Sequence, residues 1–136
     1  MLRKNAKVEL IRQVPLFAHC SKKELTEIAG AADEMDFAPG KVLTREGRRG
    51  HEFFVLVEGT ADVRRNGRRL NTMRSGDFFG EIALLSGKPR TATVTATSAV
   101  RALVLTEGTF KELMRKTPSL PYKLLQAVVA RLPVDS

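Results

Sequence analysis

The sequence contains little cysteine and no long apolar run, and both shortages exclude classes of protein. Cys20 is the single cysteine, so an internal disulfide framework is impossible and a reducing, cytoplasmic setting is expected. The longest uncharged stretch near the middle, residues 91–100, is rich in threonine and alanine and is too short and polar to span a bilayer. The first residues lack the apolar segment of a signal peptide. We therefore expect no membrane span and no secretory leader.

Metal-ligating and catalytic side chains are also sparse. His19 and Cys20 are adjacent, but the other histidine, His51, lies far along the chain, which is not the ligand spacing of a zinc site. No Ser-His-Asp or Cys-His arrangement for nucleophilic catalysis is recognisable. The sequence therefore predicts no metal site, no cofactor and no enzymatic activity.

Positive charge is what the chain has in excess. Its 136 residues include 23 Lys and Arg against 15 Asp and Glu, a formal net charge of +8, and 43% of them are hydrophobic, which is enough for the core of one domain. Arginines gather at two turns: Arg45, Arg48 and Arg49 at the first, and Arg64, Arg65, Arg68 and Arg69 at the second. Such clusters bind nucleic acid, an anionic membrane or an acidic partner, or are simply solvated hairpin tips.

The hydrophobic period divides this single domain, residues 1–136, into three segments. Residues 1–33 show the helical period of about 3.6, and residues 34–106 alternate with a period of about two. Residues 107–132 become helical again. The middle segment contains seven or eight short strands at regular spacing, which favours a mainly β, α+β class. This spacing suggests either a sandwich or an eight-stranded jelly-roll β-barrel (β-roll), flanked by N-terminal and C-terminal helices.

Local signals locate several elements. Ser21 and Glu24 form a capping-box pattern at the start of a helix, and Thr109 and Glu112 form a second one. Asn66-Gly67 lies between two strand-like runs, which predicts a hairpin with positive φ at both positions. The apolar run at 52–58 is expected to be a central strand.

Residues 79–94, FGEIALLSGKPRTATV, carry the chemistry. Gly80 lets the backbone approach another group closely, and the short helix that follows presents free N–H groups at its start. Arg90 lies nine residues after Glu81 and can bind a phosphate with two hydrogen bonds, while Glu81 can accept one from a sugar hydroxyl. Together they indicate a sugar-phosphate site. The alternative is a structural ion pair between Glu81 and Arg90 beside a surface turn.

This segment resembles the phosphate-binding cassette of the cyclic-nucleotide-binding domain family. The family signature runs Phe-Gly-Glu, a hydrophobic residue, Ala, Leu and a short turn, then Arg, a small residue, Ala, a small residue and Val. Every element is present here in order. The resemblance extends to residues 14–24, to the strand and glycine at 53–59 and to the approach at 75–80, so it covers roughly residues 14–131.

The resemblance implies a role for each cassette residue. Arg90 would pair with the cyclic phosphate, and Glu81 would accept a hydrogen bond from the ribose 2′-hydroxyl. Backbone N–H groups would hold the phosphate or ribose at four positions: Gly80, Ile82, Ala83 and Thr91. The Thr91 hydroxyl can also bond the phosphate and the 2-amino group of a syn guanine. Threonine here occurs in cGMP-preferring members and is tolerated in cAMP binders, so both ligands stay open, with cAMP preferred.

The base is expected among apolar residues of the roll, beneath the final helix. Alternation and position select Val63, Leu70, Met73, Tyr122 and Arg131. The motif does not extend to these residues, and the apolar ones in the strands could equally be ordinary core.

The resemblance implies a cyclic-nucleotide sensor. Ligand binding would change the packing of the C-terminal helices, residues 107–132, which would act as a lid, and an unidentified protein effector would recognise the change. Only about thirty residues follow the last strand, which leaves no room for a DNA-recognition helix, so we expect a stand-alone domain. The alternative function is a β-roll that binds no nucleotide and docks protein or nucleic acid through its basic surface.

Overall fold

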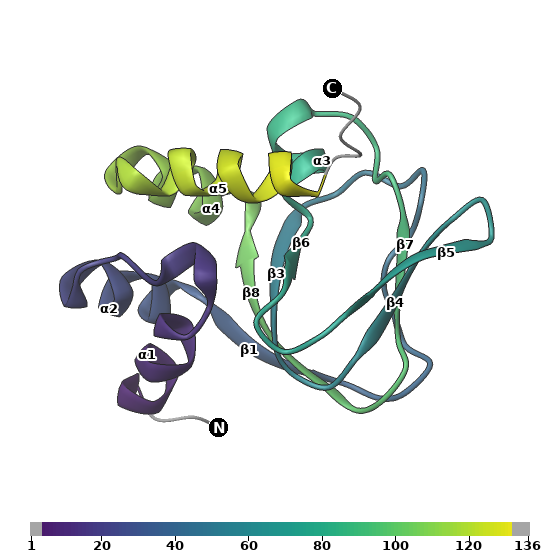
Figure 1. Ribbon diagram of the computed structural model, residues 1–136, viewed down its shortest axis with the longest axis horizontal. Helices are drawn as coiled ribbons and strands as arrows, with labels where there is room; N and C mark the ends of the chain where they lie inside the picture. The colour runs from purple at the N-terminus through teal and green to yellow at the C-terminus, as the bar shows by residue number, and fades with distance from the viewer. Residues whose placement is uncertain (1–3, 132–136) are drawn as a thin grey trace.

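Two antiparallel sheets face each other at the centre of the molecule (Figure 1). The computed structural model describes residues 4–131. One sheet has the strand order β1-β8-β3-β6, and the other has the order β2-β7-β4-β5. The strands are β1 Asp33–Phe37, β2 Val42–Thr44, β3 Glu52–Glu58, β4 Ala61–Arg65, β5 Arg68–Met73, β6 Phe78–Phe79, β7 Thr93–Ala96 and β8 Val100–Thr106. This arrangement fits the predicted jelly-roll class.

Helices from both ends of the chain gather on one side, beyond the β1-β8-β3-β6 sheet (Figure 1). The helices are α1 Lys4–Arg12, the short 3₁₀ turn η1 Pro15–Phe17, α2 Lys22–Ala31, α3 Glu81–Ser86, α4 Glu107–Lys116 and α5 Ser119–Ala130. Helix α3 lies apart from the others, between β6 and β7 in the chain, and the end of α5 reaches toward it (Figure 1). The C-terminal helices therefore connect the helical layer to the segment that carries the candidate site.

Strand β3 is buried on both faces because it lies between two hydrophobic cores. Phe53 and Val55 face the core shared with the helices, whereas Phe54 and Leu56 face the core between the two sheets. Successive side chains of a strand point to opposite faces of the sheet. A strand that has a hydrophobic core on each face, as β3 has, therefore needs apolar residues at every successive position. The predicted central position of β3 is confirmed, since β8 and β6 pair with its two edges.

Two local predictions are confirmed. The Ser21 hydroxyl accepts a hydrogen bond from the Glu24 backbone N–H at 3.1 Å, and the Ser21 N–H donates to Glu24 Oε1 at 2.7 Å. This reciprocal pair is the capping box that starts α2. Asn66 has a φ of 52° and Gly67 a φ of 76°, the conformation required at the β4–β5 hairpin.

The predicted capping box at Thr109 and Glu112 is wrong. Helix α4 begins earlier, and its N-cap is Thr106, the last residue of β8. The Thr109 backbone N–H donates to the Thr106 hydroxyl at 3.3 Å, so Thr109 is a capped residue of the first turn. The strand therefore runs directly into the helix. The predicted helix end at Leu132 falls outside the described residues, within which α5 ends at Ala130.

Phe110 fastens α4 to the roll, and its truncation tests that junction. Its side chain has no exposed surface, and its ring centroid lies 4.8 Å from that of Phe53. We expect Phe110→Ala to lower the free energy of unfolding by about 3–5 kcal/mol, the usual cost of emptying a buried aromatic site. Urea denaturation measures this change. Leu125→Ala, on the exposed face of α5, is the control and should cost less than about 0.5 kcal/mol.

Candidate functional site

The turn into α3 is built on a glycine that no other residue could replace without strain. Gly80 has a φ of 101°, and a Cβ at this position would lie 2.7 Å from the Glu52 carbonyl oxygen and 2.9 Å from Arg90 Nη1. The chain therefore passes against the start of β3 at a distance that only glycine allows. The close approach brings the first residue of α3, Glu81, beside the Arg90 side chain.

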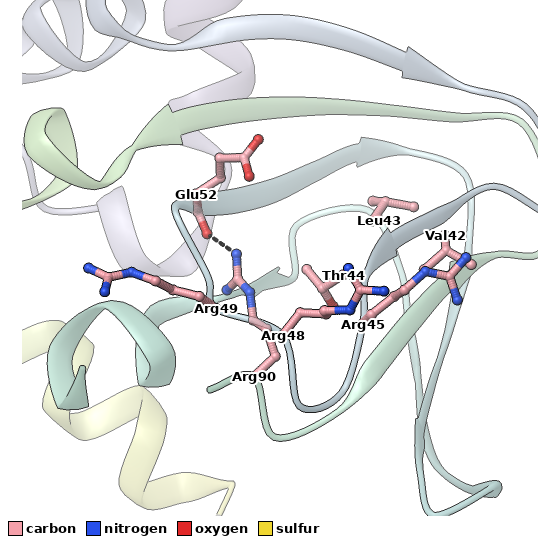
Figure 2. Close-up of a pocket in the computed structure, with 8 residues that line it drawn as sticks. All are labelled: Val42, Leu43, Thr44, Arg45, Arg48, Arg49, Glu52 and Arg90. Carbon is pink, nitrogen blue, oxygen red and sulfur yellow. Dashed lines mark hydrogen bonds between the residues drawn. The ribbon is translucent and has the colours of Figure 1, made fainter. Parts of the chain in front are cut away.

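Arg90 is buried without a carboxylate partner. Its side chain donates from Nη2 to the Glu52 carbonyl at 2.8 Å and from Nη1 to the Gly80 carbonyl at 3.1 Å, and Figure 2 shows the first of these bonds. The residue is 8% exposed, and within residues 4–131 no Asp or Glu oxygen forms an ion pair with it. Burial lowers the pKa of the Arg90 guanidinium, while the Glu52 and Glu81 charges raise it. A buried cation held only by carbonyl groups is suited to receive an anion.

Glu81 is the buried acidic residue that lies beside the buried Arg90. It is 2% exposed, and its Oε1 accepts a hydrogen bond from Arg131 Nη1 at 3.0 Å. Its Oε2 is buried and has no hydrogen-bond partner in the described part of the chain. Burial raises the pKa of the Glu81 carboxyl, whereas a hydrogen bond from its own backbone N–H and the charges of Arg131 and Arg90 lower it. The sequence alternative of a Glu81–Arg90 ion pair is therefore not formed, because Glu81 pairs with Arg131.

Arg131 reaches this carboxylate from the end of α5. Its Nη2 donates to the Phe78 carbonyl at 2.6 Å, and its guanidinium carbon lies 4.1 Å from the centre of the Phe78 ring. Sequence reasoning assigned Arg131 to the base pocket, whereas its observed contacts are with the predicted ribose residue and with β6. Fifty residues separate it from Glu81, so no local motif could have indicated the contact.

The remaining predicted residues occupy varied environments. Among the cassette residues, Ala83 is buried, Gly80 is half-buried, and Ile82 and Thr91 are exposed. Of the predicted base-pocket residues, Met73 is buried in the core between the sheets, Val63 packs against that core, and Leu70 and Tyr122 are 50% and 61% exposed. The structure thus brings Arg90, Glu81 and Arg131 together, and it leaves Leu70 and Tyr122 facing solvent.

An arginine-rich cavity of about 240 Å³ adjoins Arg90 (Figure 2). Its lining residues are Val42, Leu43, Thr44, Arg45, Arg48, Arg49, Glu52 and Arg90. The side chains of Arg45 and Arg49 point in opposite directions in Figure 2 and do not converge on one point. One of the two arginine clusters found in the sequence therefore lies beside the candidate site.

Gly50 is a site residue that sequence reasoning missed. A Cβ there would lie 2.4 Å from Arg90 Nε and 2.5 Å from Arg90 Cζ, so the guanidinium rests directly on the Gly50 backbone. The only sequence signal is a second glycine in the loop 45–50. Gly50 and Gly80 together make the space in which Arg90 lies.

Two features are absent from the described part of the chain. Between residues 4 and 131, no three His, Cys, Asp or Glu side chains come together as metal ligands. No helix in that range is long and apolar enough to cross a membrane.

Comparison with known proteins identifies the domain. A family model described as cyclic nucleotide-binding domain matches residues 34–117, which is more than half of the chain. The chain belongs to this family. The match includes both buried charged residues of the cyclic nucleotide-binding domain, Arg90 and Glu81.

Individual relatives agree with this membership. The cAMP-dependent protein kinase regulatory subunit of Hypocrea atroviridis is 36% identical over 104 residues, which is 76% of this chain and 22% of that protein. The cGMP-dependent protein kinase of Toxoplasma gondii is 36% identical over 112 residues, 82% of this chain and 11% of that protein. The regulatory domain of Toxoplasma gondii PKA, solved with cAMP, matches with a TM-score of 0.80 at 26% identity, over 92% of this chain and 50% of that one. The cyclic nucleotide-binding domain described here thus corresponds to one part of longer proteins.

Gly50→Ala tests whether the backbone of this domain makes room for Arg90. The added methyl group overlaps the guanidinium, so we expect the free energy of unfolding to fall by about 1–3 kcal/mol. The same substitution at Gly30, in α2 with nothing within 4 Å of its Cβ, should be neutral or stabilise by up to about 1 kcal/mol. Urea denaturation compares the two variants. Equal effects at both positions would contradict the assignment of Gly50.

The raised pKa of Glu81 predicts a pH-dependent stability. The folded state holds the Glu81 proton more tightly than the unfolded chain does, so releasing that proton disfavours folding. We compare the free energy of unfolding of the wild-type domain with that of Glu81→Gln. The wild-type value minus the variant value should fall as the pH rises from the ordinary glutamate pKa through the raised pKa of Glu81. Below and above this pH range, the difference in free energy of unfolding should be constant. Denaturation at a series of pH values measures it, and a difference that rises with pH would contradict the burial argument.

Proposed function

We propose that the domain binds a cyclic nucleotide, with Arg90 on the cyclic phosphate and Glu81 on the ribose 2′-hydroxyl. The observation that carries this proposal is a buried cation and a buried carboxylate that lie at one turn and are not paired with each other. Arg90 has only carbonyl partners, and Glu81 Oε2 has no hydrogen-bond donor among residues 4–131. A cyclic phosphodiester would supply the missing anion, and the adjacent ribose hydroxyl would supply the missing donor.

The chemistry of this pair selects the ligand class. A phosphodiester carries one negative charge, which a single arginine can match without a metal ion. Backbone N–H groups of Ile82, Ala83 and Thr91 would complete the phosphate contacts, with Gly80 on the ribose side. The base would lie toward Val63, Leu70 and Met73 in the strands. Tyr122 and Arg131 would complete the pocket when the C-terminal helices close over it.

Either cAMP or cGMP fits the proposal, and we favour cAMP. One relative is named a cAMP-dependent kinase regulatory subunit and another a cGMP-dependent kinase. The Toxoplasma gondii regulatory domain was solved with cAMP. Thr91 is compatible with both ligands, so direct comparison of the two must rank them.

We propose a regulatory role without catalysis for the single domain at 1–136. Ligand binding would alter how the lid helices α4 and α5 pack on the roll, and a protein effector would read that change. A cytoplasmic location is consistent with the free, half-buried Cys20. The similarity of this chain to a cAMP-dependent protein kinase regulatory subunit supports this role.

The proposed function predicts thermal stabilisation by ligand. cAMP or cGMP at about 100 times its Kd should stabilise the wild-type domain by about 2.7 kcal/mol, whereas 5′-AMP, which lacks the cyclic phosphate, should not.

Arg90→Ala should weaken cyclic-nucleotide binding by about 2–5 kcal/mol in titration calorimetry, because it removes one partner of a buried charge pair. Arg68→Ala, at the exposed β4–β5 hairpin, is the matched control and should bind like the wild type.

Two outcomes would reject the proposal. Absence of a thermal shift with both cyclic nucleotides would favour the alternative of a β-roll that docks a macromolecule through its basic surface. Unchanged affinity in Arg90→Ala would show that the nucleotide binds somewhere other than the turn into α3. The same titrations rank cAMP against cGMP.

A further inference from the structure

The exposed arginines of two turns lie together at one end of the β2-β7-β4-β5 sheet. We propose that they bind double-stranded DNA without sequence preference, with the β4–β5 hairpin in the major groove. None of these arginines has a role in the proposed cyclic-nucleotide site, so the inference goes beyond that function. We call them the arginine surface, which consists of Arg45, Arg48 and Arg49 after β2 and Arg64, Arg65, Arg68 and Arg69 in the hairpin.

The pairing of the strands brings the two clusters together. Strand β7 lies between β2 and β4, so the loop after β2 and the β4–β5 hairpin leave the sheet at the same end. Glu46 links them, because its backbone N–H donates to the Thr93 hydroxyl at 3.0 Å and its Oε1 accepts from the Asn66 N–H at 2.9 Å. Arg65 Nε also donates to the Thr91 carbonyl at 2.9 Å. Two clusters that are separate in the sequence are therefore fixed in one surface.

The arginine surface has little compensating negative charge. All seven residues are exposed, and among residues 4–131 only Arg64 forms an ion pair, with Asp62 at 3.4 Å. The register of the hairpin also sets Arg64 opposite Arg69 and Arg65 opposite Arg68. Like charges that face each other directly destabilise a pair of strands. The fold therefore contains a repulsion that a bound polyanion would relieve.

The spread of these charges fits an extended polyanion better than a single small anion. The side chains of Arg45 and Arg49 point in opposite directions and do not enclose one point (Figure 2). Residues 64–69, RRNGRR, include no aromatic or aliphatic side chain of the kind that anchors most protein interfaces. A phosphate backbone repeats its charge along its length, and each guanidinium can bind a phosphate with two hydrogen bonds. These features favour a nucleic acid over an acidic protein.

The shape of the hairpin favours a duplex. Successive residues of a strand point to opposite faces, so Arg64 and Arg69 lie on one face of the hairpin and Arg65 and Arg68 on the other. Figure 1 shows the hairpin extending beyond the roll. The major groove of B-DNA is about 12 Å wide and admits a two-stranded β-ribbon. A ribbon with positive charge on both faces would meet the phosphates of both DNA strands there, whereas a flat anionic membrane would contact one face alone.

Fluorescence anisotropy with a short labelled DNA duplex tests the inference on the full chain. The affinity should fall steeply as salt is added, because each neutralised phosphate releases counterions. The four hairpin arginines alone predict a slope of about −4 in a plot of log K against log salt concentration. A second duplex of unrelated sequence should bind with the same affinity, because phosphate contacts do not read the bases.

The double variant Arg68→Gln/Arg69→Gln removes two charges from β5. We expect duplex binding to weaken about tenfold at low salt and the salt slope to become shallower by about 2. The variant should also need more urea to unfold, because the facing arginines no longer repel each other, so weaker binding would not reflect a loss of folding. The control Lys22→Gln/Arg115→Gln removes the same net charge from exposed residues of α2 and α4 and should bind the duplex like the wild type.

Three outcomes would overturn the inference. Equal weakening in the two double variants would show that net charge, and not the arginine surface, attracts the duplex. Tighter binding to phosphatidylserine vesicles or to polyglutamate at the same salt concentration would assign the surface to a membrane or to an acidic protein. Equal affinity for the duplex and for one of its separate strands would reject the placement of the hairpin in a groove. None of these measurements depends on cAMP or cGMP binding, so their failure is distinct from failure of the proposed function.

Discussion

The site depends on two opposite charges that are buried at one turn and are not paired with each other. Arg90 is held by the carbonyls of Glu52 and Gly80, and Glu81 is held by Arg131. A direct pair would satisfy both groups and would leave no reason for an anion and a hydroxyl to bind. Because the two groups have different partners, Arg90 has no carboxylate partner and Glu81 Oε2 has no hydrogen-bond donor within residues 4–131.

The scaffold that maintains this separation is strand β3 and the loop before it. The Glu52 carbonyl at the start of β3 receives Arg90, and Gly50 just before it provides the surface on which the guanidinium lies. Further along β3, alternate side chains face the helical core and the core between the sheets. The strand that positions the cation thus also contributes to both cores, so the site rests on a strand that is buried on both faces.

Sequence reasoning succeeded where the signal is local. The Asn66-Gly67 hairpin, the Ser21 cap and the short helix after Gly80 each follow from neighbouring residues, and the change of hydrophobic period indicated the β-roll. It failed where the partner is distant or where two caps compete. Gly50 matters only because Arg90 folds onto it, and the contact of Arg131 with Glu81 exists only because α5 returns to α3. The cap of α4 was misplaced because Thr106 and Thr109 are both suitable, and only the path of β8 selects Thr106.

The exposed position of Tyr122 gives the protein an intrinsic optical probe. The chain contains no tryptophan and one tyrosine, so its tyrosine fluorescence originates from α5 alone. Tyr122 is 61% exposed, so its emission is sensitive to whatever covers or uncovers that face of the helix. A movement of the C-terminal helix could therefore be followed in solution without attaching a label and without altering any residue at the turn into α3.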